Sequence, residues 1–318
     1  MKLKMALVVV LLFAFMGGVF GQQRDETSAP EKVRELLKEL REEIQKKRYS
    51  FSVGYNPALD YTIDQLAGLR ETGEWWRIAR DKNLFKLKPR KLRALEATVA
   101  LPATWDWRDQ NGVTSVKDQR DCGSCWAFGS IASFESFLLI KQDTTVDLSE
   151  QHLVSCNPNG WGCNGGWWPH DMFIDPGAVL ERDFPYVAAD TPCGGPYNYP
   201  FQISGWAYVD GEDKVPDTDK IKEAIYNYGP IAAAVYVGSA FQAYTGGVFD
   251  KDEATNGGLF SCCGEQPKVN HGIAMVGWDD SKQAWIIKNS WGSGWGESGY
   301  MYIKWGVSNI GYGAAVLY

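Results

Sequence analysis

The number and placement of the cysteines constrain this chain most strongly. Seven cysteines are present in 318 residues, and all of them lie between positions 122 and 263. Cysteines pair as disulfides in exported proteins and mostly stay reduced in the cytosol, so their meaning depends on the compartment. Because seven is odd, an exported chain keeps at least one sulfur outside the disulfides, and that sulfur is either accidental or chemical.

The N-terminus has the pattern of a secretory signal peptide. Lys2 and Lys4 precede an uncharged apolar run over residues 5–16, small residues follow, and the chain turns polar from residue 22. The run is short against the ~20 residues that span a bilayer, which argues against a retained anchor. We therefore predict a signal peptide over residues 1–21, disulfides, and a mature protein without membrane attachment.

Charge argues against nucleic acid as a partner. The formal net charge is −7, whereas a nucleic-acid-binding surface needs clustered Lys and Arg. This mild acidity is typical of a soluble protein.

The composition changes near residue 101. Residues 31–48 place Val33, Leu36, Leu40 and Ile44 on one stripe of a predicted helix, with charges of both signs on the other face. Residues 82–93 are basic, and after residue 101 Trp, Gly and Cys become frequent. We predict an N-terminal region over 22–100 and a main domain over 101–318.

Within the main domain, helical patterns come first and strand patterns later. A long buried helix begins at residue 124, a second follows the capping residue Ser149, and a third covers 217–228. Strand patterns follow at 231–237, 273–277, 285–288 and 300–305. This order predicts an α+β fold with a helical half over about 111–208 and a β-rich half made mostly from 209–318, with the active site in the cleft between them.

The strongest chemical signal is Cys125, in the first turn of the long predicted helix. The partial positive charge of a helix N-terminus favours a thiolate, which a cationic partner then holds as an ion pair. The chain has three histidines. His271 opens an apolar strand and is the predicted partner, while His152 and His170 fit packing or surface roles better.

Two amides complete the predicted site. Asn289 ends an apolar strand, from where its side chain can accept the imidazole N–H and orient the ring. Gln119 precedes Cys125 by six residues, and its side-chain N–H with the Cys125 amide forms a donor pair for an oxyanion.

Other readings of the same cysteines remain. Cys122 and Cys125 have the spacing of a redox dithiol, although no strand precedes them as that fold requires. Cys122, Cys125, Cys156 and Cys163 are also candidate zinc ligands with unusual spacing. A catalytically inactive binding module is a third alternative, and a peptide ligase that uses the same acyl-enzyme is a fourth.

Five motifs in order resemble the papain family of cysteine proteases, which includes papain and the cathepsins. They are residues 119–130, Ser149-Glu150-Gln151, Cys163-Asn164-Gly165-Gly166, Asn270-His271-Gly272 and Lys288-Asn289-Ser290-Trp291-Gly292. The resemblance implies a papain-like two-lobed α+β fold, with a helical left lobe, a β-barrel-like right lobe and an N-terminal propeptide. It implies a monomeric endopeptidase that cuts peptide and protein substrates without a metal or organic cofactor.

The resemblance also assigns roles. Gln119 becomes the oxyanion donor, Cys125 the nucleophile, His271 the general acid and base, and Asn289 its orienter. The resemblance further implies a set of substrate-binding residues: Gly123, Gly165, Gly166, Trp167, Trp168, Ala234, Asn270 and Trp291. For the three tryptophans in this set, packing in the core is the alternative.

The disulfides implied by the resemblance are Cys122–Cys163 and Cys156–Cys193. The chain departs from the family in its last cysteines, because residues 311–315 hold no partner for a third bridge. We predict a bridge between the adjacent Cys262 and Cys263 instead, with free thiols or a bridge between chains as alternatives.

The N-terminal region resembles a family propeptide more distantly. Gly54-x-Asn56-x-Ala58-x-Asp60 matches a Gly-Asn-Phe-Asp motif except at Ala58. The resemblance implies that this region inhibits the enzyme by blocking its cleft, and Asp60 is a candidate for acid-triggered release; the alternative is a solvated helical linker. The expected localisation of the mature protein is the cell exterior or an acidic, lysosome-like compartment.

Overall fold

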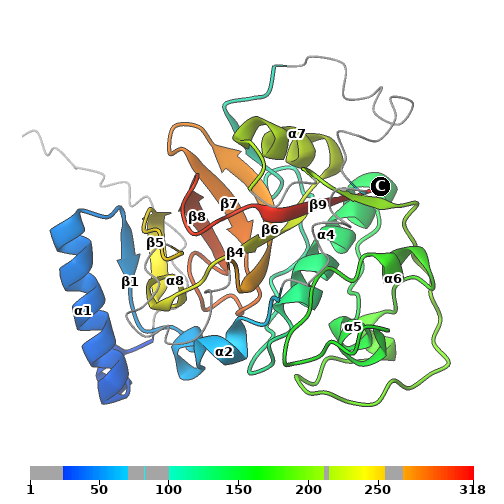
Figure 1. The fold of residues 1–318 in the computed structure, drawn as a ribbon, viewed down its shortest axis with the longest axis horizontal. Helices are drawn as coiled ribbons and strands as arrows, with labels where there is room; N and C mark the ends of the chain where they lie inside the picture. The colour runs from blue at the N-terminus through cyan, green and yellow to red at the C-terminus, as the bar shows by residue number, and fades with distance from the viewer. Residues whose placement is uncertain (1–23, 71–81, 83–99, 211–214, 255–267) are drawn as a thin grey trace, which may run out of the picture.

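The computed structural model describes residues 24–70, 82, 100–210, 215–254 and 268–318. The predicted signal peptide and the Cys262–Cys263 pair lie outside the described residues. Helices α1 and α2 belong to the N-terminal region, and α4 to α8 to the main domain (Figure 1). The helices are α1 (Glu31–Lys47), α2 (Ile63–Leu66), α4 (Cys125–Gln142), α5 (Glu150–Cys156), α6 (Asp171–Ile174), α7 (Thr218–Tyr228) and α8 (Ser239–Gln242), with 3-10 turns η1 (Glu26–Ser28), η2 (Pro57–Asp60) and η4 (Glu181–Asp183).

One sheet organises the described residues. Its strands follow the order β1-β5-β8-β7-β6-β4-β9-β3, and β2 pairs separately with β6. Strands β5 and β8 are parallel, and the other pairs are antiparallel. The strands are β1 (Phe51–Val53), β2 (Thr104–Asp106), β3 (Trp206–Tyr208), β4 (Ile231–Val235), β5 (Tyr244–Phe249), β6 (His271–Asp279), β7 (Ala284–Lys288), β8 (Tyr300–Lys304) and β9 (Tyr312–Leu317).

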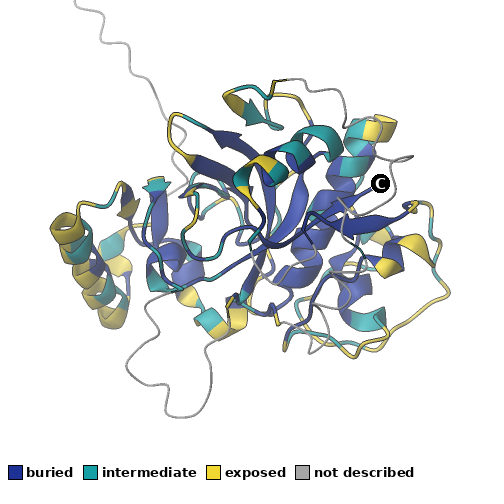
Figure 2. Ribbon diagram, turned by 45° about the horizontal axis from the view of Figure 1, so that its top comes forward, coloured by how far each residue is buried: buried dark blue, intermediate teal, exposed yellow. Residues whose placement is uncertain are grey.

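Helix α4 joins the helical half to the sheet. It is apolar on nearly all sides, and its residues from Cys125 to Ile131 are all buried (Figure 2). Gly129 lies against the backbone of Ile273 in β6, where even an added Cβ would be within 3.2–3.4 Å of main-chain atoms. This close approach brings the start of α4 next to the start of β6.

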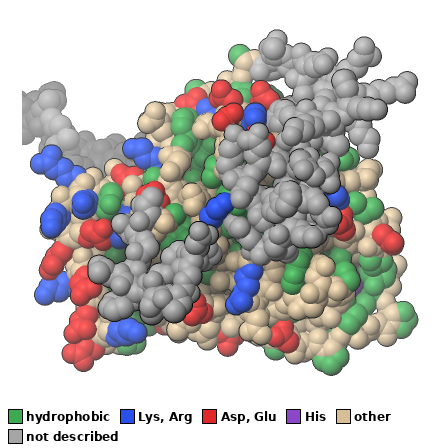
Figure 3. Space-filling model, viewed as in Figure 1, with side chains coloured by type: hydrophobic (Ala, Val, Ile, Leu, Met, Phe, Trp, Pro, Cys, Tyr) green, Lys and Arg blue, Asp and Glu red, His purple; other side chains and the backbone are tan. Residues whose placement is uncertain are grey.

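The N-terminal region packs along the opposite edge of the sheet from β3. Strand β1 pairs with β5, and Leu37 and Leu40 of α1 are buried in the same apolar cluster as the β-rich half. The outward surface around α1 carries both acidic and basic side chains (Figure 3). Lys251 of the main domain also pairs with Glu43 of α1 at 2.6 Å. These contacts contradict the alternative of a solvated linker.

The motif residues Asn56 and Asp60 act differently. The buried side chain of Asn56 donates to the Gln242 carbonyl at 3.0 Å and so ties the N-terminal region to the main domain. Asp60 instead pairs with Arg24 and accepts from Tyr55, both within the N-terminal region. Its part in acid-triggered release stays a prediction.

The predicted elements and the structure agree best where the apolar periodicity is long. The helices predicted at 31–48, 124 onward and 217–228 are confirmed as α1, α4 and α7, and Ser149 accepts from the His152 amide as a cap should. The four predicted strands are confirmed as β4, β6, β7 and β8. Strand β3, at the very end of the expected helical half, pairs with β9 of the β-rich half.

Two disulfides brace the helical half. Cys122 is bonded to Cys163 and Cys156 to Cys193, as expected from the sequence resemblance. The second bridge fixes the end of α5 to an exposed loop. No helix in the described part of the chain has the length and apolar character to cross a membrane.

Removing the second bridge should destabilise the fold without abolishing it. We expect the double variant Cys156→Ala/Cys193→Ala to lose about 2–4 kcal/mol of unfolding free energy, because its unfolded chain regains loop freedom. Denaturant unfolding measures this, with Asn159→Ala, exposed in the loop that follows α5, as the control. An unchanged unfolding midpoint in the double variant would contradict the expectation.

Candidate active site

Cys125 is the first residue of α4 and is fully buried. It is the one free cysteine among the described residues. Burial raises the pKa of its thiol to about 11, although backbone amides of Gly272, Gly68, Trp126 and Leu69 act in the opposite direction. Gly68 and Leu69 belong to the N-terminal region, so this region reaches the sulfur itself.

His271 is the first residue of β6 and is buried, and the residue after it, Gly272, lies against Cys125. Its Nε2 lies 2.8 Å from Oδ1 of Asn289, and its Nδ1 lies 3.1 Å from the Leu66 carbonyl oxygen. Burial lowers the pKa of His271 to about 4, while the contacts with Asn289 and Leu66 raise it less. The Trp291 ring, 4.8 Å away between centroids, packs on the imidazole.

The predicted thiolate–imidazolium pair is therefore not the favoured form in this structure. Residues 66–70 of the N-terminal region lie over Cys125 and His271, in the groove that these two residues line, and bury both side chains. Burial disfavours the charged form of each group. While these residues are docked, burial therefore shifts both the thiol and the imidazole toward their neutral forms.

The side-chain amide of Gln119 points at the Leu66 carbonyl, the same group that faces His271. Its Nε2 donates to the Leu66 carbonyl at 2.9 Å and to the Cys122 carbonyl at 2.9 Å. Its Oε1 accepts from the Ser290 hydroxyl at 2.7 Å, and the Ser290 amide donates to Oδ1 of Asn289 at 2.8 Å. Ser290 thus fixes both amides, a role that its place beside Asn289 in the sequence motif alone did not reveal.

Residues 66–70 occupy the groove as a peptide would. The Leu69 amide donates to the Asn270 carbonyl, the Gly166 amide to the Gly68 carbonyl, and the Arg70 amide to the Gly166 carbonyl, each at 2.9 Å. Leu69 and Gly166 form a parallel bridge. The groove therefore offers main-chain donors and acceptors to an extended backbone.

Leu69 also marks an apolar pocket. Its side chain is buried in the cluster that includes Trp167, Trp168 and Ala234. The two indole N–H groups donate to the Tyr208 hydroxyl and the Gly313 carbonyl, which fixes both rings. The tryptophans thus pack in the core and also share a cluster with a side chain in the groove.

Glycines allow the docked segment to lie this close. A Cβ added at Gly68 would overlap the Gly123 carbonyl, and one at Gly165 would overlap the Gly68 carbonyl. Gly165 also has φ +116°, in the left-handed region that favours glycine.

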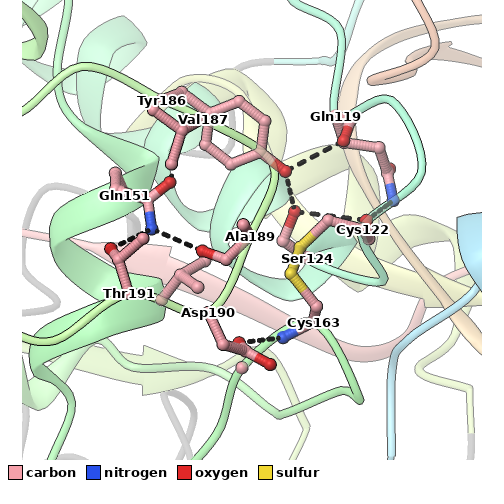
Figure 4. The surroundings of a disulfide bond; sticks show 12 residues. Gln119, Cys122, Ser124, Gln151, Cys163, Tyr186, Val187, Ala189, Asp190 and Thr191 are labelled. Atoms are coloured by element: carbon pink, nitrogen blue, oxygen red, sulfur yellow. Dashed lines mark hydrogen bonds between the residues drawn. A yellow bond between two sulfur atoms is a disulfide. The ribbon is translucent and has the colours of Figure 1, made fainter.

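The Cys122–Cys163 disulfide holds the loop before α4 in place (Figure 4). The Tyr186 hydroxyl donates to the Gln119 carbonyl at 2.9 Å and lies 2.7 Å from the Ser124 hydroxyl. Sequence analysis did not single out Tyr186, because nothing near it in the sequence connects it to Gln119. The disulfide also leaves Cys122 unable to serve a redox dithiol or a zinc site, which contradicts both alternatives.

A charge cluster in which the Glu135 and Glu150 side chains are buried lies behind the site, and sequence analysis missed it. The Lys117 ammonium contacts carboxylates of Glu135 at 2.8 Å, Glu150 at 3.0 Å and Asp147 at 2.6 Å. Burial raises the pKa of Glu150 to about 8, against the opposing effect of Lys117. Lys117, Glu150 and Asn289 line the same small cavity, so this cluster supports the wall behind the groove.

The remaining histidines do not join the groove. His152 and His170 are buried, and burial lowers their pKa values to about 4 and about 3. His152 packs on Tyr197 and Tyr199. Both therefore serve packing, as expected.

Residues 101–318 match the sequence family described as papain family cysteine protease. This chain belongs to that family. It is 37% identical to viral cathepsin of Cydia pomonella granulosis virus over 66% of this chain, and 38% identical to vignain of Ricinus communis over 67%. The matches span 59% and 58% of those relatives' own length.

Solved structures of precursor forms are similar to the papain-family chain along most of its length. Procathepsin L2 proteinase from Tenebrio molitor larval midgut is 32% identical, with a TM-score of 0.74 and 90% of each chain covered. The proform of the ragweed pollen cysteine protease Amb a 11 is 25% identical, with a TM-score of 0.71 over 91% of this chain and 80% of that one. The likeness thus extends to the region before residue 101.

The raised pKa of Cys125 has a measurable consequence. With residues 66–70 docked, we expect alkylation of Cys125 by iodoacetamide to be slow at neutral pH and to rise as the pH approaches about 11, because the thiolate is the reacting form. Mass spectrometry of the intact chain gives the rate, with the denatured chain as control. Rapid alkylation of the intact, folded chain at neutral pH would refute the neutral thiol.

Proposed function

We propose that the chain is the precursor of a cysteine endopeptidase whose N-terminal region inhibits it. The observation that carries this proposal is the Leu66 carbonyl, which accepts from Gln119 and faces His271. A peptide backbone therefore lies across the proposed catalytic groups, with Gly68 and Leu69 amides near the sulfur.

The catalytic cycle begins once the N-terminal region has left. Water and the helix N-terminus then favour the ionised pair, and the Cys125 thiolate attacks a peptide carbonyl carbon. Gln119 Nε2 and the Cys125 amide, which has no partner inside the helix, donate to the oxyanion. His271 protonates the leaving amine through Nδ1, the nitrogen that faces the groove, while Asn289 holds Nε2.

Hydrolysis then returns the enzyme to its starting state. His271 accepts a proton from water, the hydroxide oxygen bonds to the acyl carbon, and the bond from this carbon to the Cys125 sulfur breaks. Ser290 positions the two amides, and Trp291 shields the contact between the imidazole and Asn289. The sequence shows no histidine-bearing insertion that plugs the groove, which favours endopeptidase action.

The substrate is a peptide or protein with an apolar side chain in the pocket of Leu69. Trp167, Trp168 and Ala234 share the buried cluster of this leucine. Gly166 and the Asn270 carbonyl bind the backbone, and the bare glycines at 123 and 165 leave it room. Support for all these roles comes from the docked N-terminal residues.

Maturation removes residues 22–100 and leaves residues 101–318 as a monomer. The start of the family match at residue 101 supports this boundary. Two disulfides indicate a protein of the secretory pathway. We propose that the protein is secreted or delivered to an acidic compartment. We also propose a Cys262–Cys263 bridge, which the mass of the non-reduced protein distinguishes from two free thiols.

A thiol-directed epoxide tests this function. Added to the mature form, it should label Cys125 alone, with one inhibitor per chain, and abolish hydrolysis of a fluorogenic peptide. Cys125→Ala should neither react nor cleave, whereas Asn159→Ala should do both. Peptide cleavage that survives complete labelling of Cys125 would contradict the proposed nucleophile.

Gly68→Ala tests the inhibitory contact. The added methyl group would overlap the Gly123 carbonyl, and such overlaps cost about 1–3 kcal/mol. We expect the epoxide to label the intact Gly68→Ala precursor about tenfold faster or more.

Asp64→Ala, exposed in α2, is the matched control. The mature enzymes from all these precursors have the same sequence, so their activities should agree. Equal labelling of the Gly68→Ala and unaltered precursors would contradict the close contact.

A further inference from the structure

Lys82 is held on the far side of the main domain from α1. Its ammonium lies 4.2 Å from the centroid of the Trp206 ring and 2.7 Å from Oδ1 of Asp171. Its carbonyl accepts from the Tyr208 amide at 2.9 Å. Asp171 begins α6, which lies at the opposite end of the molecule from α1 (Figure 1).

The groups around Lys82 form a prepared site for a cation. The Trp206 indole N–H donates to Asp171 Oδ1 at 2.8 Å, so the ring that accepts the cation on its face also fixes the carboxylate. Trp206 is itself held by the buried His170 ring, 5.2 Å away between centroids, and by Tyr208 at 5.0 Å. A cation over an indole and beside a carboxylate gains from both contacts.

The hydrogen bond between the Tyr208 amide and the Lys82 carbonyl shows that the site also binds the backbone of the residue it holds. Strand β3 ends the sheet, and no other described strand pairs with its outer edge. The Tyr208 amide on that edge binds the Lys82 carbonyl. The site therefore accepts a residue of a chain that runs along the strand edge, and not only a free amine.

We propose that Asp171, Trp206 and the outer edge of β3 form a second binding site in the mature enzyme, which takes a Lys or Arg residue of a protein substrate. This rests on the proposed endopeptidase function. Residues 66–70 and Lys82 of one chain occupy the groove and this second site together. A substrate segment that fills the groove is joined in the same way to a flanking basic residue.

The second site would select substrates by a basic residue outside the segment bound in the groove, and not by the residues next to the cleaved bond. Asp171 is largely exposed, with 74% of its side chain accessible, so the ion pair by itself adds little affinity. The cation–indole contact adds to it, and together they predict a preference of about three- to tenfold for a correctly spaced basic residue.

A lysine-walking experiment tests the site. Fluorogenic peptides share one groove-binding sequence, and a single lysine is moved along either flank, with glutamine at each position as the reference. For the mature enzyme, we expect kcat/KM to be about three- to tenfold higher for lysine than for glutamine at one or two adjacent flank positions.

Charge removal at the site provides the comparison. Asp171→Asn keeps an oxygen for the Trp206 N–H and removes the charge, so the lysine-to-glutamine ratio should fall measurably, and the remaining preference reports the cation–indole contact. The exposed Asp175→Asn, in the same segment, is the matched control and should keep the ratio. A ratio near one at every position, or one that is undiminished in Asp171→Asn, would overturn the second site.

The two proposals fail differently in this experiment. Cleavage of the glutamine reference peptides reports the endopeptidase function alone. If these are cut while no flank position prefers lysine, Lys82 is held only within the precursor and the second site is refuted. If no peptide is cut, the proposed function fails as well.

Discussion

The Leu66 carbonyl oxygen is the contact on which the arrangement of the site depends. It accepts from the Gln119 amide, faces Nδ1 of His271, and belongs to a backbone whose next residues reach Cys125. Asn289 and Ser290 hold the other sides of these groups, so the docked backbone and the catalytic side chains form one connected set of hydrogen bonds. Burial under these residues explains why the pKa of the thiol is raised and that of the ring is lowered in a site assembled for ionic chemistry.

Neutralisation of the pair does not by itself make docking pH-dependent. A thiol with a neutral imidazole carries one proton, and so does a thiolate with an imidazolium, so docking moves this proton without taking one up. The predicted acid-triggered release therefore needs other groups. Burial raises the pKa of Asp171, but hydrogen bonds from Lys82 of the N-terminal region and from Trp206 lower it by more. Their stabilising contribution is present above the ordinary carboxyl pKa and is lost as pH falls through the lowered value.

The sequence predicted what local patterns encode. The first turn before a long apolar helix located Cys125, and a polar residue at either end of apolar strands located His271 and Asn289. Strands β5 and β9 escaped prediction because Gly246, Gly247 and Gly313 interrupt the usual β-branched pattern. The shifted pKa values of Cys125 and His271 and the binding site of Lys82 depend on residues far apart in the chain. Only the folded structure brings these residues together.

Nitrogen NMR of the three histidine rings in the intact precursor tests the central claim most directly. All three rings are buried, and the pKa values are lowered to about 4 for His271 and His152 and to about 3 for His170. At neutral pH the account therefore predicts that every ring in the intact, uncleaved precursor is neutral, and that His271 gains a proton only as the pH falls toward about 4. An imidazolium signal from His271 at neutral pH, with residues 66–70 still docked, would contradict it.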